Sequence, residues 1–185
     1  MDLFAASLAL LGATSYPVDN VPTQKLWLYS CDVLLPNTCF RLPTGMSVTY
    51  QVPTDSGVYQ VKRSDGVSML IYTGSAPDRS RMTGVPSLEL DSSTHRLTAF
   101  VSGGGETGNL DIFISPKASR STTTVTHLHS NRTNDSRDLM AQVVSGLRPC
   151  VRKSREHLVC PTRSIWGEAL SRWVLDVGAK GDGGN

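Results

Sequence analysis

His127 and His129 stand two residues apart and form the only closely spaced histidine pair of the 185-residue chain. Successive side chains of a β-strand point to opposite faces, so on a strand both imidazoles would share one face, as two ligands of one metal ion must. A metal site needs a third ligand, and no motif in the neighbouring sequence indicates one. The surrounding stretch is polar and rich in threonine. The sequence therefore predicts exposed histidines without a metal, and a metal-dependent hydrolase that uses His127 and His129 is kept as an alternative.

The sequence lacks other motifs for catalysis or cofactor binding. No serine lies in a Gly-x-Ser-x-Gly nucleophile elbow. The glycine-rich segment 103–108 lacks the Gly-Lys-Ser/Thr ending of a phosphate-binding loop. The sequence thus assigns no catalytic residue and no cofactor, and it favours a non-enzymatic protein.

Four cysteines form two local pairs, Cys31 with Cys39 and Cys150 with Cys160. An even number in close pairs is typical of a disulfide framework, which persists in oxidising compartments. Each pair would close a loop of roughly ten residues and stabilise the fold by about 2–3 kcal/mol. Four reduced cysteines in a cytosolic protein are the alternative, and zinc is disfavoured because neither spacing is the close C-x2-C kind. We expect two disulfides and an extracytoplasmic protein, secreted or periplasmic, with a cytoplasmic location as the alternative.

The N-terminal segment also bears on the compartment in which the protein resides. An apolar run over 4–13 has the length of a signal peptide, and Ala13-Thr-Ser15 offers a small-x-small cleavage pattern. Against this, the chain begins with Met-Asp, whereas an export signal usually begins with positive charge. Residues 1–24 are therefore interpreted as a candidate signal peptide, or else as a structural N-terminal segment. The run is too short to span a bilayer, so no transmembrane segment is predicted.

Basic residues concentrate in one place, the segment 148–155, and a helix with two tryptophans follows it. Such a cluster is typical of contact with an acidic partner, here a protein or an acidic polysaccharide. Nucleic acid is disfavoured, because the cluster lacks interleaved aromatic residues and the whole chain has a net charge of only +2. The predicted partner-binding residues are Arg148, Arg152, Lys153, Arg155, Trp166 and Trp173.

Apolar residues return at every second position through much of 46–114. In 46–52, for example, Val48 and Tyr50 fall on one face and Thr49 on the other. The segments 95–101 and 109–115 repeat this pattern, and turn residues such as Ser64-Asp-Gly66 separate the runs. Roughly eight short strands at this spacing are typical of an all-β sandwich or barrel. The predicted fold is mainly β, an antiparallel β-sandwich with a small C-terminal helical extension.

Two segments carry a loose resemblance to known modules. They are Phe-x-Leu-Pro-x-Gly over 40–45 and Asn-Leu-Asp-Ile-Phe-Ile over 109–114, with short alternating strands between them. This succession resembles the jelly-roll and immunoglobulin-like modules of secreted proteins, over about residues 25–116. The resemblance implies a sandwich of one of these two kinds and transfers no site residue, because many unrelated functions share such folds.

The pattern changes to a helical period in the C-terminal part. Leu139, Val143 and Leu147 recur at every fourth position, and 164–177 shows a stronger apolar stripe that ends at Gly178. The predicted organisation is therefore a β-sandwich module over 25–116, a polar linker or edge strand over 117–136, and a disulfide-tied helical extension over 137–185. We expect an exported, non-enzymatic module that recognises a partner through its surface. A structural subunit of a larger envelope, secretion or virion assembly is the first alternative.

Overall fold

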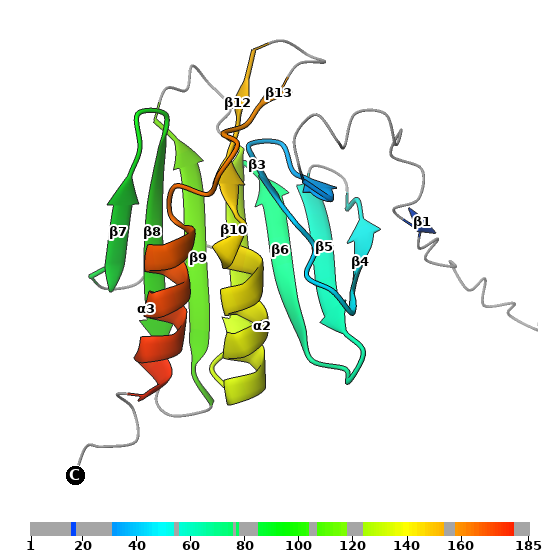
Figure 1. The fold of residues 1–185 in the computed structure, drawn as a ribbon, viewed down its shortest axis with the longest axis vertical. Helices are drawn as coiled ribbons and strands as arrows, with labels where there is room; N and C mark the ends of the chain where they lie inside the picture. The colour runs from blue at the N-terminus through cyan, green and yellow to red at the C-terminus, as the bar shows by residue number, and fades with distance from the viewer. Residues whose placement is uncertain are drawn as a thin grey trace, which may run out of the picture.

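A computed structural model shows the arrangement of the chain (Figure 1). The residues that it describes are 16–17, 31–53, 56–75, 77, 85–103, 107–117, 124–153 and 158–179. The candidate signal sequence and its cleavage pattern over 1–15 lie outside the described residues. Among the described helices, none is long and apolar enough to cross a membrane.

One large antiparallel sheet dominates the fold. Its spatial order is β1-β4-β5-β6-β10-β9-β8-β7, so two meanders, β4 to β6 and β7 to β10, meet where β6 pairs with β10. The alternating runs predicted from the sequence form most of these strands. The strand bounds are β1 Tyr16–Pro17, β4 Met46–Gln51, β5 Ser56–Arg63, β6 Ser68–Gly74, β7 Leu88–Asp91, β8 His95–Ser102, β9 Asn109–Pro116 and β10 Val125–Asn131.

Two helices, α2 (Asn134–Ser145) and α3 (Gly167–Ala179), lie side by side over one face of the sheet (Figure 1). α2 begins after Thr133, whose side chain accepts a hydrogen bond from the Ser136 backbone N–H. The core between the two layers is apolar and fully buried. Its largest side chains include Phe40, Met69, Ile71, Leu97, Leu110, Ile112, Ile114, Leu128, Leu139, Met140 and Leu147.

Two small sheets complete the described structure. The first has the order β11-β3-β2, and it joins the segment between β1 and β4 to the segment after α2. The second is the hairpin of β12 and β13. Their bounds are β2 Val33–Leu34, β3 Thr38–Phe40, β11 Arg148–Pro149, β12 Val151–Arg152 and β13 Leu158–Val159.

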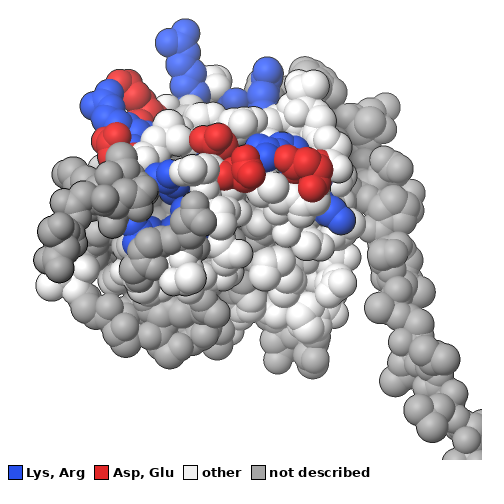
Figure 2. Space-filling model, turned by 90° about the horizontal axis from the view of Figure 1, so that it is seen from below, with Lys and Arg blue, Asp and Glu red and all other residues white. Residues whose placement is uncertain are grey.

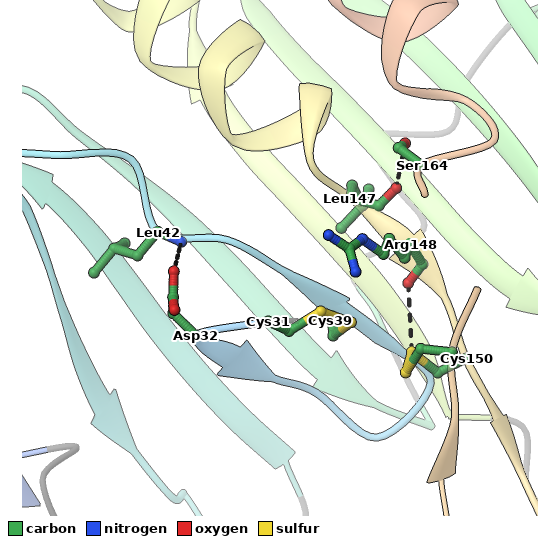
Figure 3. The surroundings of a disulfide bond; sticks show 9 residues. Cys31, Asp32, Cys39, Leu42, Leu147, Arg148, Cys150 and Ser164 are labelled. Atoms are coloured by element: carbon green, nitrogen blue, oxygen red, sulfur yellow. Dashed lines mark hydrogen bonds between the residues drawn. A yellow bond between two sulfur atoms is a disulfide. The ribbon is translucent and has the colours of Figure 1, made fainter. Parts of the chain in front are cut away.

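Both expected disulfides are present, Cys31–Cys39 and Cys150–Cys160. They lie next to each other at the β11-β3-β2 sheet (Figure 3). Within the loop that Cys31–Cys39 closes, the Asn37 side chain donates to the Thr124 carbonyl oxygen at 2.8 Å and accepts from the Thr126 hydroxyl. The first disulfide therefore holds a loop that is hydrogen-bonded to the start of β10.

The mainly β antiparallel fold and the helical extension are confirmed. The described residues do not show the two large facing sheets of a jelly-roll or immunoglobulin-like sandwich, and that part stays a prediction. One face of the large sheet is covered instead by α2, α3 and the small β11-β3-β2 sheet.

The expected boundary at residue 117 needs a correction. The segment 117–136 was predicted to be a linker or an edge strand, but β10 lies in the middle of the sheet between β6 and β9. Its polar residues are accommodated because Thr126 and Ser130 are buried with hydrogen-bond partners on the core side. The region after 116 is therefore part of the same core as 25–116.

Candidate metal centre

The register of β9 and β10 brings a third potential ligand to the histidine pair. His129 lies opposite Asp111, and His127 lies opposite Phe113. Leu128, between the two histidines, belongs to the core that α2 and α3 cover, so both imidazoles lie on the other face of the sheet. Asp111, His127 and His129 thus converge at the centre of the face opposite the helices.

The carboxylate of Asp111 bridges the two imidazoles. Its Oδ1 lies 2.8 Å from His127 Nε2 and 2.9 Å from His129 Nδ1. One ligand atom from each of the three side chains falls within 4.8 Å of the other two. Two imidazole nitrogens and one carboxylate are a donor set suited to Zn²⁺ or another late divalent transition metal.

Aromatic and apolar side chains enclose one side of this cluster. The Phe113 ring stacks on the His127 ring with centroids 4.1 Å apart, and Phe100 contacts Phe113 edge to face. Val125 completes this small apolar cluster. Asp111 is fully buried and His127 nearly so, while the His129 side chain is 21% exposed. Solvent therefore reaches the cluster mainly at His129.

Asp111 is ionised despite its burial. Burial by itself raises the pKa of this carboxyl, but the hydrogen bonds from His127 and then His129 outweigh it and lower the pKa to about 2. An ionised carboxylate only accepts hydrogen bonds, so His127 Nε2–H and His129 Nδ1–H are the donors in the metal-free protein. The cluster is therefore a buried negative charge between two imidazoles.

The second oxygen of Asp111 carries the strongest signal for a ligand. Oδ2 is buried and has no hydrogen-bond partner among the described residues. A buried, unpartnered oxygen of a charged carboxylate costs free energy unless a cation or water satisfies it. A metal ion held by Asp111, His127 and His129 would supply that positive charge.

The sequence singles out the two histidines but not Asp111. It predicts both histidines to be exposed and without a metal, whereas His127 is buried against Phe113. Asp111 lies 16 residues before His127 within an otherwise apolar run. A charged residue inside such a run was the available signal. Only the pairing of β9 with β10 shows that it meets the histidines.

The predicted partner-binding residues do not form one surface. Arg148 is buried, and Trp166 is buried in the core beneath the helices. Their burial removes both from an exposed recognition surface. Trp173 is partly buried against the same core, and it lines a pocket of about 400 Å³ beside β7, on the helix-covered face. Arg152 and Lys153 are exposed at the β12–β13 hairpin, and Arg155 lies outside the described residues.

Charges at the lower end of the molecule are mixed in sign. Figure 2 shows acidic and basic side chains next to one another there. The ion pairs at this end agree with this picture, because Arg63 contacts both Asp65 and Asp135. The described residues at this end do not form the single-sign patch that would steer a strongly acidic partner.

Neither a protein-family model, nor a curated protein, nor a solved structure matches this chain.

Proposed function

We propose that this protein binds a divalent transition-metal ion, best matched by Zn²⁺, through Asp111, His127 and His129. The observation that carries the proposal is the fully buried Asp111 carboxylate, whose Oδ1 joins both imidazoles and whose Oδ2 lacks a partner among the described residues. Two neighbouring strands in the centre of the sheet hold the three ligands, so the site is rigid before metal arrives.

Metal binding at this site requires each of the two neutral histidines to change its tautomer. The two nitrogens that now donate to Asp111 must lose their protons to become ligands, and these protons can move to the other nitrogen of each ring. A zinc ion held by these three residues would keep one position for water, and the partly exposed His129 side chain is where solvent reaches the cluster. A metal-dependent hydrolase using His127 and His129 would need this water, and that activity stays an alternative within the proposal.

The disulfides support an exported protein as the setting. Two disulfides indicate an oxidising, extracytoplasmic environment. Recognition of a protein or polysaccharide partner remains a proposal for the exposed hairpin residues Arg152 and Lys153. The Cys150–Cys160 disulfide ties that hairpin and lowers the entropy lost on binding.

The test is zinc affinity of the oxidised protein, measured by competition with a chromophoric chelator after metal has been removed. We expect one Zn²⁺ per chain. His127→Gln and His129→Gln should each weaken zinc binding at least ~100-fold. Loss of a residue that only hydrogen-bonds to a metal ligand already lowers metal affinity by up to about 100-fold, and loss of the ligand itself should lower it further. Both disulfides stay closed, so no thiol competes for the metal.

His95→Gln is the matched control. His95 is a buried histidine at the start of β8, hydrogen-bonded to Thr94 and outside the cluster. Its substitution should leave zinc affinity within about twofold, even where it lowers stability. Equal zinc affinity of wild type, His127→Gln and His129→Gln, with all three folded, would refute the proposed function, as would a wild-type protein that binds no zinc.

A further inference from the structure

The sulfur atoms of all four cysteines gather in one place. Besides its own disulfide with Cys31, Cys39 Sγ lies within 4.8 Å of both Cys150 Sγ and Cys160 Sγ. Figure 3 shows the Cys31–Cys39 bond beside Cys150. The two disulfides are therefore a single cluster of four sulfurs, contributed by segments more than a hundred residues apart in the sequence.

Backbone hydrogen bonds hold these two segments together independently of the sulfurs. β3 pairs with β11, which places Cys39 opposite Arg148. The Cys150 backbone N–H also donates to the Asn37 carbonyl oxygen at 2.8 Å. The Ser164 hydroxyl in turn bonds the Leu147 carbonyl oxygen at the end of α2 (Figure 3). Opening the disulfides would therefore leave the four sulfurs close to one another.

The surroundings suit a dry metal site with one open side. Cys31, Cys39 and Cys150 are each at most 2% exposed, and Cys160 is only partly buried. Leu34 and Leu158 pack against the sulfurs. The buried Arg148 guanidinium, on the residue that pairs with Cys39, adds positive charge to this region.

We propose that Cys31, Cys39, Cys150 and Cys160 form one tetrathiolate zinc site when both disulfides are reduced. A tetrahedron with Zn–S bonds of about 2.3 Å has S···S edges of about 3.8 Å. The sulfurs of Cys39, Cys150 and Cys160 already lie within 4.8 Å of one another, and Cys31 Sγ, outside that group, must move the most. Zinc sites of this kind are closed and structural, which fits the burial of three of the four sulfurs.

The conversion balances with a dithiol reductant. Each disulfide takes two electrons and two protons from a dithiol, which becomes a disulfide, and yields two thiols. Zn²⁺ then binds the four sulfurs as thiolates and displaces four protons. Zinc would thus replace the two disulfides as the clamp between the β2–β3 segment and the C-terminal region in a reducing compartment. This inference goes beyond the proposed function and uses none of its three ligands.

The test uses Co²⁺ as a probe in the Asp111→Asn variant, which removes the carboxylate of the other site. The protein is reduced with a phosphine under argon and titrated with Co²⁺. We expect sulfur-to-cobalt charge-transfer absorption that saturates at one Co²⁺ per chain and disappears on addition of Zn²⁺. The oxidised protein of the same variant is the control and should show none of this absorption.

Two serine variants then test whether all four sulfurs participate. Cys31→Ser and Cys160→Ser should each weaken Co²⁺ binding of the reduced protein at least ~10-fold. Circular dichroism of the reduced protein before metal addition should retain the β-sheet signal. A reduced protein that is folded but shows no charge-transfer band, one that has unfolded, or a Cys31→Ser variant with unchanged affinity would each overturn the inference. None of these outcomes depends on whether the Asp111 site binds zinc.

Discussion

Ile71→Asn should unfold the protein or destabilise it by roughly 4 kcal/mol or more, which is a large part of the stability of a small domain. Ile71 lies in β6 between Tyr59 of β5 and Leu128 of β10, and it is 0% exposed. Asparagine at this position would leave a cavity and bury an amide with no partner in the apolar core. Chemical denaturation of both proteins, with the midpoint and slope compared, measures the loss.

Leu70→Asn is the matched control for this substitution. Leu70 precedes Ile71 in the same strand, but its side chain points to the other face and is 42% exposed. The same substitution there should cost less than about 1 kcal/mol, because an exposed amide keeps its water. If Leu70→Asn and Ile71→Asn unfolded at the same denaturant concentration, the assignment of the two sheet faces would be wrong.

Acidification should remove roughly 2 kcal/mol of stability from the metal-free protein through Asp111 alone. The pKa of Asp111 is about 2 in the folded protein and 3.8 for the ordinary group. A depressed folded pKa means that the ionised form stabilises the fold. This contribution is therefore complete above the unfolded value and is lost as the pH falls from about 4 through about 2.

Asp111→Asn isolates this effect. The amide has the shape of the carboxylate but no charge, so the variant should be less stable near neutral pH and should approach wild type at about pH 2. Unfolding is measured in a chelator across the pH series. Asp65→Asn, which removes the exposed partner of Arg63, should show a much weaker pH dependence, because solvent screens surface ion pairs. Parallel pH profiles for wild type and Asp111→Asn would contradict the assigned role of the carboxylate.

Short-range sequence signals predicted most of the elements. The alternation through β4 and β8 is visible because one face of each strand is more deeply buried than the other. β9 is buried on both faces, and its alternation comes from Asp111 on the face opposite Leu110 and Ile112. The cysteine pairs are also local, and they closed as expected. Helix ends were less well defined: α2 begins at Asn134 behind the Thr133 cap, and α3 extends through Gly178 to Ala179.

β10 illustrates why a strand can be missed or misplaced. The sequence Val-Thr-His-Leu-His-Ser-Asn has few apolar residues, and composition alone indicates a linker. Thr126 is nevertheless buried, because Asn37, 89 residues away, supplies its hydrogen-bond partner. No local pattern encodes a partner at that separation.

The sequence by itself determined most of the strand-forming segments, the two helices, the local spacing of the cysteines and the shared face of His127 and His129. Only the tertiary structure decided that β10 is central, that Asp111 meets the histidines, and that the two disulfides adjoin. Arg148 and Trp166, both predicted from the sequence as partner-binding residues, lie in the interior. The physical reason is that side-chain periodicity is a property of one segment, whereas strand order, register and burial arise from contacts between segments distant in the chain.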